Sequence, residues 1–214
     1  MIPESLKQLI ESEVPKLPGW TSWERGVELA ELIFSEAAKE RSADLPLVFV
    51  EIGTFGGRAC LPAALAFQQL KRGKAYTIDP WRSLPCLEGE SAPNKEYWSK
   101  VPFEDIHQSF METLWRLGLD DWLVPMRCAS HQCHECFRWI DILLIDGCHS
   151  ESASKRDTEL YLPKVPPQGI VIMDDLRWCD QNGKRTTQAA AKMIEAAGQR
   201  IGGNEDYGVW RWKP

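Results

Sequence analysis

The chain has 214 residues, of which 43% are hydrophobic and 26% charged, and 25 basic against 31 acidic side chains give a formal net charge of −6. This length predicts one domain that can bury a closed core. Because the chain is acidic and has no dense block of lysine and arginine, we do not expect nucleic acid to be its main partner.

The sequence also argues against a membrane or secreted protein. Its longest apolar runs are far shorter than the ~18 residues of a membrane span. The first residues have neither the basic start nor the apolar segment of a secretory signal. Seven cysteines, an odd number in a chain of this length, favour reduced thiols and a cytoplasmic location. A homo-oligomer is left open.

Short apolar strands alternate with helical patterns, which predicts an α/β fold with a mostly parallel sheet. Strands are expected at 47–52, 75–78, 122–126, 140–145, 169–173 and 207–212. Helices are expected at 3–14, 21–37, from the glycine turn to residue 70, and at 103–117, 152–161 and 186–197. The nearly continuous apolar run at 47–52 is typical of a central strand that is covered on both faces.

Local patterns predict where some elements begin and end. Thr21 and Glu24 form a T-x-x-E capping box, which predicts a helix start at Thr21. Gly118 predicts the end of the helix at 103–117. Prolines interrupt the stretch 80–102, and such long irregular connections are uncommon in compact domains unless they carry function. We expect a lid or substrate-binding loop at 80–102, with a disordered or packing insertion as the alternative.

Acidic residues and glycines follow the predicted strands. In an open parallel sheet, ligands bind outside the carboxyl ends of the strands, so these residues are candidates for a binding site. Carboxylates at such positions suit a ligand with hydroxyl groups or a cation. The residues are Glu51, Gly53, Gly56 and Gly57 after the first strand, Asp79 after the second, Ala129 and Ser130 after the third, Asp146 and His149 after the fourth, and Asp174 and Asp175 after the fifth.

The spacing of the first glycines separates two kinds of cofactor. A dinucleotide fingerprint requires G-x-G-x-x-G, whereas Gly53 is followed by Gly56 and Gly57. Glu51 would repel a pyrophosphate but suits an ammonium group, and Asp79 can accept hydrogen bonds from the vicinal hydroxyls of a ribose. The combination favours S-adenosylmethionine, with a simple tight turn between strand and helix as the alternative.

Four segments resemble successive motifs of class I S-adenosylmethionine-dependent methyltransferases: VEIGTFGGRAC, YTIDPW, IDILLIDGCHSESASKRDTELYLPK and QGIVIMDDL. The resemblance extends from about Trp20 to Trp212 and is closest to small-molecule O-methyltransferases, especially the metal-assisted enzymes that act on sugars and macrolides. It implies a Rossmann-like, doubly wound sheet of seven strands, mostly parallel with the last strand antiparallel. It also implies one methyltransferase domain over 1–214, in which N-terminal helices at 1–45 cover the cofactor site.

The same resemblance implies which residues bind the cofactor. The methionine part of the cofactor would be bordered by Glu51, Gly53, Thr54 and Gly57, and its ribose by Asp79. Pro80 and Trp81 would lie beside the adenine or ribose edge, and Ala129 and Ser130 beside the adenine. Asp146 would lie nearby, and Trp20 and Thr21 would lie above the cofactor. The family commonly has an aspartate where this chain has Ala129. The contact to the adenine amino group is therefore expected from Ser130 or from the backbone.

A cation site and a base are implied as well. Asp146, Asp174 and Asp175 match three oxygen ligands of Mg²⁺ in metal-dependent relatives, and such a cation lowers the pKa of a bound hydroxyl. His149 lies where relatives have a general base, and imidazoles titrate near neutrality. Alternatively, Asp146 can serve without metal, the aspartate pair can cap a helix, and His149 can hydrogen-bond within its turn. Relatives often have an aromatic residue near Glu151, which this chain lacks.

The predicted function is methyl transfer from S-adenosylmethionine to a hydroxyl of a small, sugar-like or polyhydroxylated molecule, assisted by a divalent cation. Alternatives are a metal-independent methyltransferase with His149 as base, a non-catalytic cofactor-binding module and, against the glycine spacing, a NAD-type oxidoreductase. A zinc site is not expected, because its candidate ligands lie too close together in sequence to surround one ion. These candidates are Cys128, His131, Cys133, His134 and Cys136.

Overall fold

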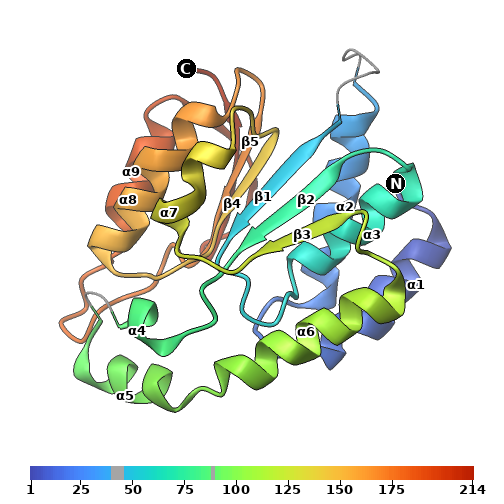
Figure 1. Ribbon diagram of the computed structural model, residues 1–214. Coiled ribbons are helices and arrows are strands. Elements are labelled where there is room, and N and C mark those ends of the chain that lie inside the picture. Colours follow the sequence, from blue (N-terminus) through green and yellow to red (C-terminus); the bar gives the residue numbers. More distant parts are fainter. Residues whose placement is uncertain (40–45, 88–89) are drawn as a thin grey trace.

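One mixed sheet runs through the computed structural model, which describes residues 1–39, 46–87 and 90–214 (Figure 1). Across the sheet, the strands of these described residues follow the order β3 (Leu123–Met126), β2 (Lys74–Ile78), β1 (Val48–Ile52), β4 (Ile142–Ile145), β5 (Ile170–Met173), β7 (Gly208–Trp212) and β6 (Gly198–Gly203). Neighbouring strands from β3 to β5 are parallel, whereas β7 is antiparallel to β5 and β6. The predicted Rossmann-like sheet is confirmed.

The strand order reverses at the centre of the sheet. β1 lies between β2 and β4, and the chain adds strands outward from it in both directions. Ile52 pairs with Ile78 on one side and with Ile145 on the other, so the residues that follow these strands emerge at the same level. Crossovers on opposite faces leave a crevice at such a reversal point. The first, second and fourth strand ends therefore open into one space.

Alternate strand residues pack into two cores, one on each face of the sheet, because successive side chains point to opposite faces. Phe49 and Leu144 join the core formed with helices α1 (Glu4–Glu13), α2 (Trp23–Ala37), α3 (Cys60–Leu70) and α6 (Phe103–Leu117). Val50 and Ile145 join the core formed with α8 (Glu151–Tyr161) and α9 (Gln188–Glu195). Figure 1 shows these two helical layers with the sheet between them.

The stretch at 80–102 contains two helices, so the expectation of an irregular loop is wrong for most of it. α4 (Ser83–Cys86) and α5 (Ala92–Lys100) lie beyond the carboxyl ends of the strands (Figure 1). The hydroxyl of Ser91 caps α5 by accepting a hydrogen bond from the Asn94 N–H at 3.4 Å. Pro93 lies in the first turn, where a helix tolerates proline. Residues 88 and 89, also within the predicted lid, lie outside the described residues.

Local capping differs from the prediction at α2 and agrees with it at α6. Ser22, not Thr21, is the N-cap of α2, and its hydroxyl accepts a hydrogen bond from the Arg25 N–H at 3.3 Å. Thr21 instead faces the cavity described below. Gly118 ends α6 in the left-handed conformation at φ +63°, as predicted. Of the predicted N-terminal covering segment at 1–45, residues 40–45 lie outside the described residues.

The C-terminal region contains a strand that the sequence did not predict. The expected helix at 186–197 is the shorter α9, and 198–203 form β6, which pairs with β7 alone at one edge of the sheet. Three of its six residues are glycines, which are depleted in strands, so the sequence alone gave no strand pattern. None of the helices in the described ranges has the length and apolar character that a membrane crossing requires.

Candidate active site

A cavity of about 800 Å³ lies at the carboxyl ends of β1 to β5. Its wall includes most of the residues that the sequence singles out, brought together from segments far apart in the chain. These are Trp20, Thr21, Glu51, Gly53, Thr54, Asp79, Pro80, Ala129, Ser130, Asp146, His149, Asp174 and Asp175. Three of the candidates, Gly56, Gly57 and Trp81, do not line the cavity.

Glu51 brings a carboxyl group to the buried floor of the cavity. Its side chain is 1% exposed, and it accepts a hydrogen bond from the Thr77 hydroxyl at 2.5 Å. Thr77 in turn contacts the Thr54 hydroxyl. Burial raises the pKa of Glu51 to about 8. A cationic ligand group beside it would favour the ionised carboxylate and lower this pKa.

The turn after β1 is shaped by Gly53 and held by Asp79. Gly53 has φ +90°, and a Cβ there would lie 2.1 Å from the Asp146 carbonyl oxygen, so a side chain cannot be accommodated. The Asp79 carboxylate accepts hydrogen bonds from the N–H groups of Thr54 at 3.1 Å, Phe55 at 2.9 Å and Trp81 at 2.7 Å. Burial nevertheless raises the pKa of Asp79. Asp79 thus fixes the turn and also borders the cavity.

Gly57 and Trp81 support the wall from behind. A Cβ at Gly57 would lie 2.3 Å from the Phe110 ring, so this glycine allows α6 to pack closely against the turn. The Trp81 side chain is buried in the core, with its ring 4.5 Å from His107 and 5.8 Å from Phe110 between centroids. Its indole N–H donates to the Phe55 carbonyl at 2.8 Å. The structure therefore does not bring these two residues to the cavity wall.

At the end of β3, Ser130 is linked to α8 rather than left free. Its hydroxyl donates to the Asp157 carboxylate at 2.5 Å, and its carbonyl accepts from the Tyr161 hydroxyl at 2.7 Å. Asp157 and its neighbour Arg156 also line the cavity, although sequence analysis did not single them out. Their place on a helix, away from the strand ends, gave no signal in the sequence.

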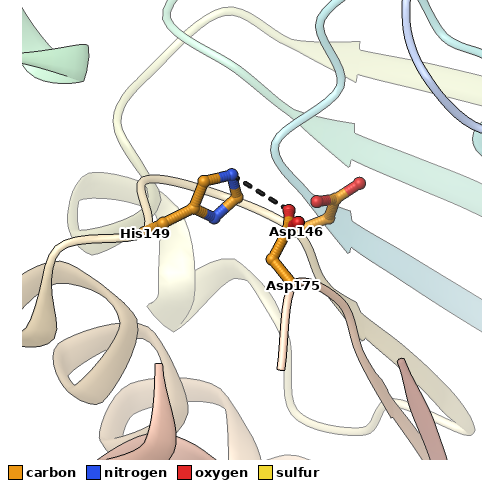
Figure 2. A group of neighbouring side chains, drawn as sticks. All are labelled: Asp146, His149 and Asp175. Atoms are coloured by element: carbon orange, nitrogen blue, oxygen red, sulfur yellow. Dashed lines mark ion pairs between the residues drawn. The ribbon is translucent and has the colours of Figure 1, made fainter. Parts of the chain in front are cut away.

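Asp146, His149 and Asp175 converge (Figure 2), and all three line the cavity. One potential ligand atom from each residue lies within 4.8 Å of those of the other two. The Nε2 atom of His149 is 3.0 Å from Asp175 Oδ2. Burial, together with the neighbouring charges of Asp174 and Asp175, raises the pKa of Asp146 well above its usual range. Burial also raises the pKa of Asp175, which the charge of His149 opposes.

Asp174 is directed at a residue that the sequence did not single out. Arg25, in the first turn of α2, donates to Asp174 Oδ2 at 2.6 Å. The guanidinium also lies 3.9 Å from the centroid of the Tyr207 ring, a stacked arrangement that is favourable for arginine. The other Asp174 oxygen accepts the Asp175 N–H at 2.9 Å. Of the predicted cation ligands, Asp146 and Asp175 thus converge with His149, while Asp174 is paired with Arg25.

The charges of the cavity suit cationic ligands. Acidic side chains outnumber basic ones in its wall: Glu51, Asp79, Glu90, Asp146, Asp157, Asp174 and Asp175 against Arg25, Arg58 and Arg156. The crowding that raises the pKa of Asp146 would be relieved by a divalent cation, since opposite charge favours the ionised form. The residues present therefore fit a sulfonium cofactor that carries an ammonium group, and they also fit a hard cation held by carboxylates.

Aromatic side chains gather on the N-terminal side of the cavity. Trp20 stacks on Phe55 with ring centroids 5.0 Å apart, and Trp98 from α5 meets both rings edge-on at 6.2 and 6.1 Å. All three residues line the cavity. The segment before α2 and the predicted lid region therefore meet over the site.

The Cys/His-rich segment is partly built into the core. Cys133 is 5% exposed, and its sulfur lies 3.5 Å from the Tyr161 hydroxyl. Burial raises the pKa of the Cys133 thiol to about 12, which disfavours the thiolate that zinc binds. Within residues 1–39, 46–87 and 90–214, the side chains that converge as potential metal ligands are Asp146, His149 and Asp175.

Comparisons with known proteins agree with this architecture. A family model described as a methyltransferase domain matches residues 50–176. The O-methyltransferase NovP has a TM-score of 0.68 at 16% identity, over 90% of this chain and 81% of that one. A putative caffeoyl-CoA O-methyltransferase from Staphylococcus aureus has a TM-score of 0.64 at 16% identity, over 98% and 93%. TomG from Streptomyces achromogenes, solved with S-adenosylmethionine, gives 0.62 at 14%, over 100% and 92%. No curated protein sequence matches.

The sheet order and the antiparallel β7 are those of class I S-adenosylmethionine-dependent methyltransferases, and the acidic cavity lies at the strand ends, where a sheet of this kind binds its ligands. The family model covers more than half of the chain, from the third residue of β1 past the end of β5. The chain therefore belongs to the methyltransferase family. The solved structures, at 16% identity or less, show the fold.

Proposed function

We propose that the protein transfers a methyl group from S-adenosylmethionine to a hydroxyl of a small, sugar-like or polyhydroxylated molecule, assisted by a divalent cation. One observation carries this proposal: Asp146, His149 and Asp175 converge in the same cavity that holds Glu51 and Asp79. Donor-binding and acceptor-activating groups then lie within one space. The described residues would form a single domain. A cytoplasmic location is also proposed, which the seven free cysteines support.

The cofactor supplies the methyl group when bound. Glu51 would neutralise its ammonium group, Asp79 would accept from its ribose hydroxyls, and Ser130 would border its adenine. Trp20 and Thr21 line the cavity wall before α2, where they would exclude water from the donor. Placing donor and acceptor in one enclosed space lowers the entropic cost of their reaction, which is the main contribution expected from a transferase of this kind.

Asp146 and Asp175 would hold the divalent cation. His149 lies beside them, whereas Asp174 is paired with Arg25. A cation held by carboxylates would lower the pKa of the acceptor hydroxyl. His149 would then take the hydroxyl proton, with Asp175 orienting its ring through the 3.0 Å contact. If His149 ligates the cation, a second base is needed, so chelation and substitution of His149 test different parts of the proposal.

A metal-independent transferase is the second candidate, and the His149–Asp175 pair favours it. A carboxylate that orients an imidazole ring is an arrangement typical of a general base. The guanidinium of Arg25, paired with Asp174, already supplies one positive charge among the carboxylates of Asp146, Asp174 and Asp175. In this mechanism His149 takes the proton without metal. NovP and TomG are described as O-methyltransferases, which supports a hydroxyl acceptor for either mechanism.

The experiment begins with calorimetric titration of S-adenosylhomocysteine, with and without Mg²⁺. Turnover is then followed by transfer of labelled methyl from S-adenosylmethionine to a panel of glycosides and vicinal diols, with Mg²⁺ or with chelator. Asp146→Asn should abolish turnover, whereas Asp120→Asn, at an exposed position outside the cavity, should leave it unchanged. Absence of S-adenosylhomocysteine binding would overturn the proposal, and full turnover in chelator would favour the metal-independent mechanism.

A further inference from the structure

A second cavity of about 390 Å³ adjoins the first. Leu144 from β4 and Ile172 from β5 form part of its wall, together with α2 and the β6–β7 hairpin. Thr21, Arg25 and Ala59 belong to the walls of both cavities. The two spaces therefore meet at the Arg25–Asp174 ion pair, beside the acidic group that we assign to the acceptor hydroxyl.

The wall of the second cavity is mostly apolar. Its apolar side chains are Leu29, Leu32, Ala59, Leu144, Ile172, Ile201 and Val209. Polar groups gather at the junction instead: Tyr207 donates to Glu28 at 2.6 Å and stacks under Arg25. A cavity with apolar walls and a few polar groups at one end suits a small ligand group that is apolar and enters from that end.

The β6–β7 hairpin leaves this space unfilled. Gly202 and Gly203 of β6 both line it. A Cβ at Gly202 would meet only Val209 within 4 Å, at 3.7 Å, and Gly202 does not have a positive φ. Its lack of a side chain is therefore not required by backbone conformation or by close packing. A larger residue there would project over the cavity without local strain.

We propose that the second cavity binds an apolar arm of the acceptor, whose hydroxyl lies at Asp146, His149 and Asp175 in the first. The acceptor class is then amphipathic: a hydroxylated head with one alkyl or similarly apolar substituent. This inference rests on the proposed function, because that function places the head. Thr21, Arg25 and Ala59 line both spaces, so an acceptor that extends past Arg25 would enter the second cavity, where burial of each methylene would strengthen binding.

The test uses 1,2-alkanediols from butanediol to octanediol as probes, titrated into the ¹⁵N-labelled protein with saturating S-adenosylhomocysteine and followed by NMR. Affinity should rise by about fourfold for each methylene that is buried, with shifts at Ala59 and Val209. In Gly202→Trp this gain should disappear, whereas binding of S-adenosylhomocysteine should be unchanged. Gln199→Trp, exposed on the same strand and outside the cavity, should keep the gain.

Two results would overturn the inference: affinity that does not depend on chain length in the unmodified protein, or a gain that Gly202→Trp retains. The second result would place the alkyl chain in the first cavity. Failure of S-adenosylhomocysteine to bind would instead count against the proposed function. The diol series in the ligand-free protein would still decide whether the second cavity takes an alkyl chain, so the two failures can be told apart.

Discussion

Glu51 places a carboxyl group where burial opposes its charge, and this has consequences for stability. Its pKa is raised to about 8 in the folded protein, whereas an unfolded glutamate titrates near 4.3. Between these values the folded protein binds more protons than the unfolded chain, so stability is highest at the acid end and falls as pH rises. Burial raises the pKa values of Asp79, Asp146 and Asp175 as well, and they act in the same direction.

We therefore expect the free energy of unfolding to fall between about pH 5 and about pH 8, with a Glu51 contribution on the order of 3 kcal/mol. Urea unfolding of the ligand-free protein across this range measures it. Glu51→Gln should show a shallower fall, because the other carboxyls still titrate. Glu112→Gln, at an exposed position, is the matched control. Equal slopes for Glu51→Gln and the unmodified protein would contradict the argument.

Arg25 contributes a positive charge beside the proposed cation site. Its 2.6 Å pairing with Asp174 opposes a divalent ion in two ways, by repulsion and by occupying a carboxylate. Arg25→Met should therefore bind Mn²⁺ about tenfold more tightly, which corresponds to about 1.4 kcal/mol. Electron paramagnetic resonance of free Mn²⁺ measures this without turnover. Arg127→Met, in an exposed ion pair with Glu104, should not change the affinity, and weaker binding by Arg25→Met would contradict the prediction.

The contacts of Asp146 and Asp175 differ from those of Asp174 in how far the sequence could predict them. Asp146 directly follows β4 and Asp175 lies two residues after the end of β5. Parallel strands bring their carboxyl ends together, so the proximity of these two residues follows from the strand pattern. Arg25 meets Asp174 across 149 residues, and Asp157 reaches Ser130 from a helix. Contacts of this kind depend on how helices pack on the sheet, which strand and helix periodicity does not specify.

At the scale of elements, Arg58 joins the segment before α2 to the turn before α3. Its guanidinium donates to the carbonyls of Leu17 at 2.7 Å, Thr21 at 3.3 Å and Pro15 at 3.3 Å. Charged donors to backbone carbonyls are individually worth about 1.5–3 kcal/mol when they are buried, and less when exposed as this side chain partly is. Arg58 thereby holds Trp20 and Thr21 beside the cavity.

Arg58→Met should loosen this segment and raise the dissociation constant of S-adenosylhomocysteine about tenfold, as for a loss of about 1.4 kcal/mol. Calorimetry measures the affinity. Arg58→Lys, which keeps the charge but not the fork of donors, should be intermediate. An affinity that Arg58→Met leaves unchanged would show that the segment does not cover the cofactor.

The predicted boundaries of an element agree with the observed ones where the local sequence pattern is strong. α6 (Phe103–Leu117) has the predicted bounds, because an apolar stripe and a terminal glycine agree on them. The sequence pattern did not predict α5 because Pro93 interrupts it, although a helix accepts proline in its first turn. β6 was missed because an edge strand rich in glycine has no alternation of apolar side chains. Ser22 rather than Thr21 is the N-cap of α2. Serine and threonine are both favoured as N-caps, so this preference does not distinguish them.

At the scale of the whole molecule, two cores share one sheet, and the cavity lies where the strand order reverses. The alternation of strands and helices predicted the class of fold, whereas the order of the strands came from the resemblance to a family. The apolar pattern predicts that each strand is buried on both faces, but it does not specify which strands lie next to it in the sheet. The site therefore depends on a global property, the reversal at β1 and β4, as much as on the acidic residues themselves.

Binding to a cavity at the carboxyl ends of β1 to β5 should stabilise the molecule as a unit. A ligand at a hundred times its dissociation constant adds about 2.7 kcal/mol, which for a chain of this size raises Tm by roughly 5–11 °C. We expect such a shift in differential scanning calorimetry with S-adenosylhomocysteine. NAD⁺ should give none, because the buried Glu51 faces the position where a pyrophosphate would bind and the G-x-G-x-x-G spacing is absent. A larger shift with NAD⁺ than with S-adenosylhomocysteine would favour an oxidoreductase on the same sheet.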